Sequence, residues 1–407
     1  MRLAWFRATA IAHATPLDPT AALIAGLQTM HDLEVFIQDN AHDFVWKAFR
    51  APYDLCVFEL DNDRSHAFVW PYLLQYGGIL FLRTLTLHDA RALALVRQGR
   101  RDDYTAEFAF NQRHAPPVTK TPPFVKEGTW PMLRVPLMAS RIAVVPHKGM
   151  AAVVQEEYPD ARVVFAPPAV REPSVSPPQS PAGPLADGLR SASRNPPYAA
   201  FGVLSSDRVD VVRRAVTRAQ EAGAAATLLI DDSPDRLLQS ADVIVTLEWP
   251  SFGEPQMCAL AAMAAGKPVI VLETEYTADW PALDPQTWQS RGSPRRGLAE
   301  AGPGAAAPIV VSIDLRDEEH SLTVAMRRLS ADGALREQLG EAGGTWCRAH
   351  TAARPAADAW QRILSDAAAL EPPPRPAGWP AHLNADGTEH ARATLADFGI
   401  TADFLAT

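Results

Sequence analysis

Residues 240–288 read SADVIVTLEWPSFGEPQMCALAAMAAGKPVIVLETEYTADWPALDPQTW. The apolar run at 243–247 is typical of a strand buried between helices, and a second such run follows at 269–272. Between the two runs, Pro255 suits the first position of a helix and Gly266 suits its end. This pattern predicts a parallel sheet with a helix N-terminus at the carboxyl edge of its strands. Such an edge suits a phosphate group, because the first N–H groups of the helix are free and its dipole is positive there.

The same alternation of apolar runs and helix-period segments extends along the chain. The strand candidates lie at residues 3–6, 33–37, 55–60, 79–82, 142–145 and 163–165 in the first half, and at 200–204, 227–230, 243–247, 269–272 and 309–313 in the second half. Most of them are apolar throughout, as in parallel strands that are covered on both faces. The pattern predicts an α/β protein with two doubly wound, Rossmann-like domains that face each other across a cleft.

Proline marks the predicted domain boundaries. The chain holds 36 prolines in 407 residues, and many of them lie in two clusters. The cluster within residues 171–197 predicts a linker, because long proline-rich connections rarely run through a folded domain. We therefore expect an N-terminal domain at 1–170, a second domain at 198–370 and a proline-rich tail at 371–407.

Charge and cysteine content exclude several classes of protein. The chain has 38 Lys and Arg against 47 Asp and Glu, a formal net charge of −9, and no basic block that alternates with aromatic residues, so a nucleic-acid binder is not expected. Its three cysteines lie far apart, as is usual in a reducing compartment. No apolar run approaches the ~20 residues that span a bilayer, and the first residues lack a signal-peptide pattern. These features predict a soluble cytoplasmic protein without a transmembrane segment.

Several segments resemble retaining nucleotide-sugar glycosyltransferases of group 1, also called family 4. The matching positions in the loop and helix are Leu247, Trp249, Pro250, Gly253, Glu254 and residues 262–271. The segments YDLCVFELDNDRSHAFVWPYL at 53–73, GRRDDYTAEFAFN at 99–111 and ASRIAVVPHKGM at 139–150 are similar to the first domain of the same group. The resemblance implies the two-domain GT-B fold, and a tail that returns to the first domain. It also implies metal-independent transfer of a hexosyl-type sugar from a nucleoside diphosphate, with retained configuration and no cofactor.

The resemblance also implies which residues act at the donor site. Glu254 matches the group's first donor-binding glutamate, while Arg83 matches the position after the fourth strand, with His88 as the other candidate there. The residues expected at the donor phosphates are Gly202, Arg208, Gly253, Pro255, Gln256 and Met257. An arginine fork and a helix N-terminus would neutralise the charge that the β-phosphate gains as the sugar bond breaks.

Other positions favour a different hypothesis. Ala261 stands where the group has its second glutamate, and Pro255, which lacks an N–H, replaces a donor to the diphosphate. The glycine-rich loop after the first strand is also absent. The alternative is therefore a catalytically silent GT-B scaffold that acts as a partner or regulator of an active glycosyltransferase. An epimerase or a phosphorylase on the same fold is a third hypothesis, which no further motif supports.

Each candidate residue also has a purely structural interpretation. Arg208 could be a solvated charge, Glu254 a carboxylate stabilised by the helix dipole, and Arg83 part of a surface salt bridge. Asp61 and Asp63 resemble an acidic metal motif, but two carboxylates are too few for a good site, so no metal is expected. The expected partners are a nucleotide sugar and an unknown acceptor, with a membrane surface or another protein as a further candidate and no nucleic acid.

Overall fold

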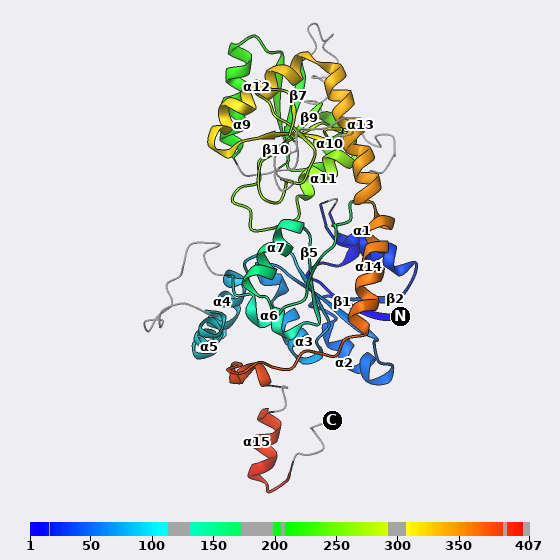
Figure 1. Ribbon diagram of the computed structural model, residues 1–407. Coiled ribbons are helices and arrows are strands. Elements are labelled where there is room, and N and C mark those ends of the chain that lie inside the picture. The colour runs from blue at the N-terminus through cyan, green and yellow to red at the C-terminus, as the bar shows by residue number, and fades with distance from the viewer. Residues whose placement is uncertain are drawn as a thin grey trace.

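The computed structural model describes residues 1–15, 17–112, 131–171, 198–204, 208–291, 307–385 and 389–401. Except for residue 171, the predicted linker lies outside the described residues. The described chain forms two domains, which Figure 1 shows one above the other. The first domain is built on six parallel strands in the order β2-β1-β3-β4-β5-β6. These strands are β1 (Arg2–Phe6), β2 (Asp32–Phe36), β3 (Leu55–Leu60), β4 (Ile79–Leu82), β5 (Ile142–Val145) and β6 (Val163–Phe165).

Helices cover both faces of the first sheet. One face packs against α1 (Ala21–Gln28) and α14 (Ala353–Ala368). The other face packs against α2 (Ala41–Arg50), α3 (Val69–Tyr76), α6 (Arg134–Ala139) and α7 (Lys148–Glu157). The pair α4 (His88–Arg97) and α5 (Arg101–Asn111) has a small apolar cluster of its own at the side of the domain. The short helices η1 (Ile11–His13) and η2 (Arg64–His66) follow β1 and β3.

The second domain is built on a sheet of seven strands in the order β12-β11-β13-β10-β9-β7-β8, parallel except for the β11–β12 pair. Its strands are β7 (Ala199–Val203), β8 (Ala226–Ile230), β9 (Val243–Thr246), β10 (Val269–Leu272), β11 (Ala282–Leu283), β12 (Ser290–Arg291) and β13 (Val310–Ile313). Helices α9 (Val209–Glu221) and α12 (Glu318–Ala331) cover one face. The other face carries α10 (Pro234–Ser240), α11 (Met257–Ala264) and α13 (Gly333–His350), and η3 (Leu315–Asp317) precedes α12.

After α13 the chain returns to the first domain. Figure 1 shows α14 beside α1, and the rings of Trp360 and Trp5 lie 5.0 Å apart between α14 and β1. Ala356, Trp360 and Leu364 recur at helical spacing and are buried against the first sheet. The predicted end of the second domain at residue 370 is therefore wrong with respect to packing: that domain ends with α13.

The tail continues along the first domain. Leu383, in η4 (Ala381–Asn384), is buried in the same core as α3, and Trp379 packs edge-on against Phe110. The final helix, α15 (Glu389–Asp397), lies beyond that domain in Figure 1. No helix in the described part of the chain is long and apolar enough to cross a membrane.

The predicted fold class is confirmed. Every strand expected from the sequence is present, with each bound within one residue of the prediction, because buried parallel strands are apolar on both faces and stand out in the sequence. The short strands β11 and β12 were not predicted, since two residues are too few to show a pattern.

Candidate functional site

A cavity of about 480 Å³ lies where the two domains meet. The first domain contributes Leu17, Asp61 and Arg83, and the second contributes Leu204, Glu248, Pro250, Ser251, Glu254, Pro255, Met257 and Cys258. Asp61 and Arg83 directly follow β3 and β4, while Leu204 directly follows β7. The cavity, which we name the cleft cavity, therefore lies at the carboxyl ends of both sheets. This is the place where open α/β sheets bind ligands.

The loop between β9 and α11 joins the domains at this cavity. Its Phe252 carbonyl accepts a hydrogen bond from the Leu85 N–H of the first domain, at 2.5 Å. Gly253 has φ +94, and a Cβ there would lie 2.8 Å from Met150 Sδ of α7. The backbone angle therefore favours glycine at this position, and an added Cβ would displace the Met150 side chain. The cleft wall is thus fixed by contact with the opposite domain.

The carboxylate of Glu254 is held from both domains. Its Oε1 accepts a hydrogen bond from Thr84 Oγ1 at 3.2 Å, across the domain boundary. Its Oε2 accepts from the Phe252 N–H at 2.7 Å and from Ser251 Oγ at 3.2 Å. These bonds orient the carboxylate at the wall of the cleft cavity, where the sequence predicted a donor-binding glutamate.

A buried histidine of the first domain contacts the same loop. His147, at the start of α7, is 7% exposed, and its Nε2 lies 3.0 Å from the backbone oxygen of Glu254. Burial lowers the pKa of His147 to about 4, so the ring is neutral at neutral pH and donates this bond through Nε2–H. Its ring lies 5.5 Å from that of Tyr276, whose pKa burial raises. The HKG sequence at 147–149 was part of the resemblance, but nothing in it singled out His147.

Arg83 is the positively charged residue in the described lining of the cleft cavity. Its side chain is 24% exposed, and its Nε lies 3.4 Å from Asp61 Oδ2. This ion pair lacks hydrogen-bond geometry, and the buried Nε has no hydrogen-bond partner among the described residues. The guanidinium thus keeps donor capacity at the end of β4, and its role at a donor site remains a prediction.

Helix α11 begins at the cleft cavity, but two residues later than predicted. Pro255 is not its first residue: the Met257 N–H bonds back to the Pro255 carbonyl at 2.7 Å, which forms a turn, and the helix starts at Met257. Pro255, Met257 and Cys258 all line the cavity. The first N–H groups of a helix lack intrahelical partners, so the positive end of α11 faces the cleft.

The described lining of the cleft cavity is nevertheless acidic. It contains the carboxylates of Asp61, Glu248 and Glu254 against the single guanidinium of Arg83. Glu248 was not predicted, because it stands in the loop after β9 without a recognisable motif. Thr84 was also missed, although its position directly after Arg83 at the end of β4 was a usable signal.

The structure places the remaining predicted residues away from the cleft lining. Arg208 pairs through Nε with Glu318 Oε2 at 2.8 Å, at the start of α9. Gly202 lies inside β7, where a Cβ would come within 2.8 Å of the Ala241 Cβ, so its role is to let β7 and the end of α10 approach. Gln256 is 4% exposed and does not line the cavity.

His88 lies in the α4–α5 pair rather than in the cleft. It is 4% exposed, its Nε2 is 2.8 Å from the Tyr104 hydroxyl, and its Nδ1 is 3.0 Å from Asp89 Oδ1. These contacts join α4 to α5 and leave Arg83 as the cleft residue of the two candidates. Within the described ranges, no group of three or more His, Cys, Asp or Glu residues could hold a metal ion.

No protein-family model matches the chain, and no curated protein matches its sequence. Sucrose-phosphate synthase from Thermosynechococcus elongatus is 13% identical, with a TM-score of 0.51 over 90% of this chain and 98% of that one. The catalytic domain of starch synthase IV from Arabidopsis thaliana, bound to ADP and acarbose, is 12% identical, with a TM-score of 0.56 over 91% and 99%. Anabaena HepE in complex with UDP-glucose is 9% identical, with a TM-score of 0.50 over 90% and 100%. The chain shares their two-domain GT-B fold, as the sequence resemblance implies.

Proposed function

We propose that the protein is a glycosyltransferase that moves a sugar from a nucleoside-diphosphate donor to an acceptor, with retained configuration and without a metal ion. The observation that carries this proposal is the meeting of Arg83, Glu254 and the start of α11 in one interdomain cavity. The proposal is supported by the fold that the chain shares with glycosyltransferases. Among these similar structures, HepE was solved with UDP-glucose and starch synthase IV with ADP.

The proposed reaction requires stabilisation of a leaving group. When the bond between the sugar and the β-phosphate breaks, negative charge develops on the phosphate oxygens. The Arg83 guanidinium and the positive end of α11 are the groups that neutralise it, and an arginine fork matches phosphate geometry. Glu254 accepts hydrogen bonds from the donor sugar. Thr84 and His147 position Glu254 and its loop, and contact between the domains excludes water from the reacting groups.

Release of nucleoside diphosphate from sugar nucleotides tests this proposal. We expect slow release from at least one of the UDP, ADP, GDP and TDP sugars, because water replaces the missing acceptor. Arg83→Ala should lower the rate roughly 100-fold, as expected for loss of a charged group that acts in the transition state. Arg354→Ala, at an exposed position on α14, should leave the rate unchanged. EDTA should have no effect, and proton NMR of the released sugar should show the donor's anomeric configuration. Release by the wild type and by Arg83→Ala at equal rates would contradict the proposal.

A silent scaffold is the second candidate function. It is favoured by the acidic lining of the cleft cavity and by the pairing of Arg208 with Glu318. Both Glu254 oxygens also already accept hydrogen bonds within the protein. A scaffold would release no nucleoside diphosphate from any of the donors and would bind none of them, so the same assay separates the two functions.

A further inference from the structure

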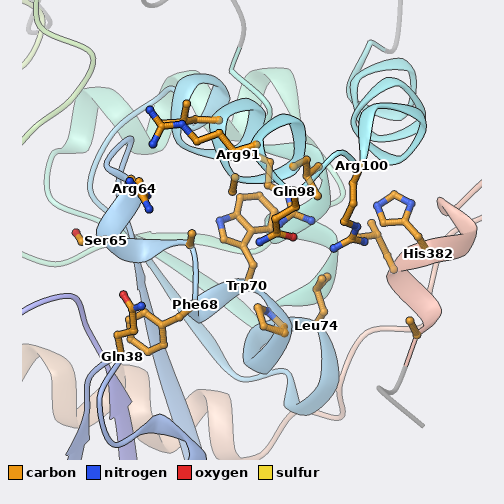
Figure 2. Close-up of a pocket in the computed structure, with 18 residues that line it drawn as sticks. Gln38, Arg64, Ser65, Phe68, Trp70, Leu74, Arg91, Gln98, Arg100 and His382 are labelled. Carbon is orange, nitrogen blue, oxygen red and sulfur yellow. The ribbon is translucent and has the colours of Figure 1, made fainter. Parts of the chain in front are cut away.

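A second, larger cavity of about 970 Å³ lies in the first domain, between η2, α3, α4 and η4. The described lining includes Arg64, Arg91, Arg97 and Arg100, together with Trp70 and His382. Among the described residues the lining has no aspartate or glutamate, so we name this cavity the arginine pocket. Figure 2 shows Trp70 at its centre, with Arg64 on one side and Arg100 beside His382 on the other.

Two of the four arginines are part of the pocket's own structure. Arg91 is 7% exposed, donates through Nε to Glu107 Oε2 at 2.8 Å, and lies 4.5 Å above the ring of Trp70. Burial alone would raise the pKa of Glu107, but hydrogen bonds from His382 and Arg91 lower it, so this carboxylate is charged. Arg100 pairs with Asp103 at 2.7 Å. The pair of Arg91 with Glu107 joins α4 to α5, whereas that of Arg100 with Asp103 lies within the start of α5.

The other two arginines, Arg64 and Arg97, are exposed, and within the described ranges neither forms an ion pair with another residue. They come from η2 and from the end of α4, yet they line the same cavity. Because the described lining of the cavity contains no carboxylate, these two guanidinium groups attract a ligand of opposite charge. Beside them, Phe68, Pro71 and Leu93 present partly exposed apolar surface. The pocket thus combines donors for an anion with a surface for an organic group.

The C-terminal tail completes one wall. His382 Nε2 lies 2.7 Å from Glu107 Oε1, and its Nδ1 lies 3.4 Å from Asp103 Oδ1. Leu383 is buried in the core of the first domain. The tail is therefore attached to the same two carboxylates that fix Arg91 and Arg100, and it encloses the cavity on the side of α5.

The arginine pocket is adjacent to the cleft cavity. Asp61 lines the cleft cavity, and Arg64 and Ser65, further along the same loop, line the arginine pocket. Three residues of fully extended chain span at most about 10 Å, so a ligand of moderate length reaches from one cavity to the other. The same loop also contacts α4, because Asn62 Oδ1 accepts the Ala90 N–H at 3.0 Å.

We propose that the arginine pocket binds the acceptor substrate through a phosphoryl group, with its organic part on Phe68, Pro71 and Leu93. A phosphoryl group is favoured over a single carboxylate because it carries about two negative charges and its oxygens match an arginine fork. The identification of this ligand as the acceptor rests on the proposed function, whereas binding of a phosphoryl group in the pocket does not. A phosphorylated acceptor bound here would extend its reacting hydroxyl past the 61–65 loop toward the donor sugar.

Titration calorimetry of the full chain with phenyl phosphate tests the proposal. The double variant Arg64→Ala/Arg97→Ala should bind phenyl phosphate at least about tenfold more weakly than the wild type, because two charge-assisted contacts are lost. Arg101→Ala, which removes an exposed arginine just outside the lining, should bind as the wild type does. Equal binding by the double variant and the wild type overturns the proposal, and so does a loss confined to Arg83→Ala.

A nucleotide titration on the same proteins separates this proposal from the proposed function. If UDP, ADP, GDP and TDP bind and the double variant keeps their affinity, the two cavities hold different substrates, as we propose. If phenyl phosphate binding depends on Arg64 and Arg97 but no nucleotide binds, the phosphoryl site is upheld and its assignment to an acceptor is overturned.

Discussion

The cleft cavity and the arginine pocket differ in charge and in construction. The described lining of the cleft cavity comes from both domains and holds three carboxylates and one arginine. The arginine pocket belongs to one domain and its tail, and its described lining holds four arginines and no carboxylate. The motif that resembles a donor site thus lies where positive charge is scarce, and the larger concentration of positive charge lies beside it. Positive charge alone would have pointed to the arginine pocket, whereas the resemblance points to the cleft cavity.

The two cavities also depend on different contacts. The cleft cavity depends on polar contacts between domains, through Leu85, Thr84 and His147. The arginine pocket depends on buried ion pairs within a domain, above all that of Arg91 with Glu107. Variants that weaken one set should therefore leave the other cavity intact. The following predictions test that separation, from the largest expected effect to the smallest.

The largest effect is expected for Arg91→Ala, which acts on the arginine pocket. Glu107 is fully buried, so removal of Arg91 leaves a buried carboxylate with His382 as its remaining partner. We expect the unfolding free energy to fall by about 3 kcal/mol, as measured by urea denaturation. The control Arg100→Ala breaks a more exposed pair and should cost less than about 1 kcal/mol. An equal loss of unfolding free energy in Arg91→Ala and Arg100→Ala would show that the buried pair does not stabilise the pocket.

His147 should make the cleft sensitive to acid. Its pKa is about 4 in the folded chain and near the ordinary 6.5 when unfolded, so the unfolded state binds the proton more tightly. Its stabilisation is therefore complete above pH 6.5 and is lost as the pH falls toward 4, by about 3 kcal/mol in total. His147→Asn should flatten this part of the stability curve in urea titrations at several pH values. His42→Asn, at a largely exposed position, should not. A wild-type curve that matches that of His147→Asn between these pH values would refute this role.

Gly253→Ala tests the close approach of the two domains. Alanine at φ +94 is strained, and its Cβ would also press on Met150, so we expect a loss of about 2 kcal/mol in thermal unfolding. Gly223 is a matched control: its φ is +84, but a Cβ there would meet nothing within 4 Å. Gly223→Ala should cost about 1 kcal/mol, from backbone strain alone. If the two variants lose the same stability, the contact with Met150 does not constrain the cleft.

The smallest effect is expected for Thr84→Val, which keeps the side-chain shape but removes the hydrogen bond to Glu254 Oε1. The free energy of unfolding should fall by about 1 kcal/mol. The free energy of nucleotide-sugar binding should weaken by a similar amount, because Glu254 is less well positioned. Thr86→Val, at a neighbouring buried threonine, serves as the comparison. A larger loss of affinity in Thr86→Val than in Thr84→Val would contradict the positioning role of Thr84.

The sequence predicts the sheets well and the cavities only in part. Buried strands such as β3 and β10 are recognisable because their own residues are apolar throughout. Glu254 and Arg83 could be placed at the cleft because of the resemblance to group 1 glycosyltransferases, and both line the cleft cavity. The partner of Arg208 could not be predicted, because Glu318 is far away along the chain. The arginine pocket could not be predicted either, since it combines η2, α4 and a tail that returns after a whole domain.

The central claim is that Arg83 and the start of α11 bind a nucleoside diphosphate in the cleft cavity. Titration calorimetry of the wild type and of Arg83→Ala with UDP, ADP, GDP and TDP tests this most directly. We predict that at least one nucleotide binds the wild type, and that its affinity falls roughly tenfold or more in Arg83→Ala. Binding that is the same in both proteins, or no binding of any of the four nucleotides to the wild type, would contradict the claim.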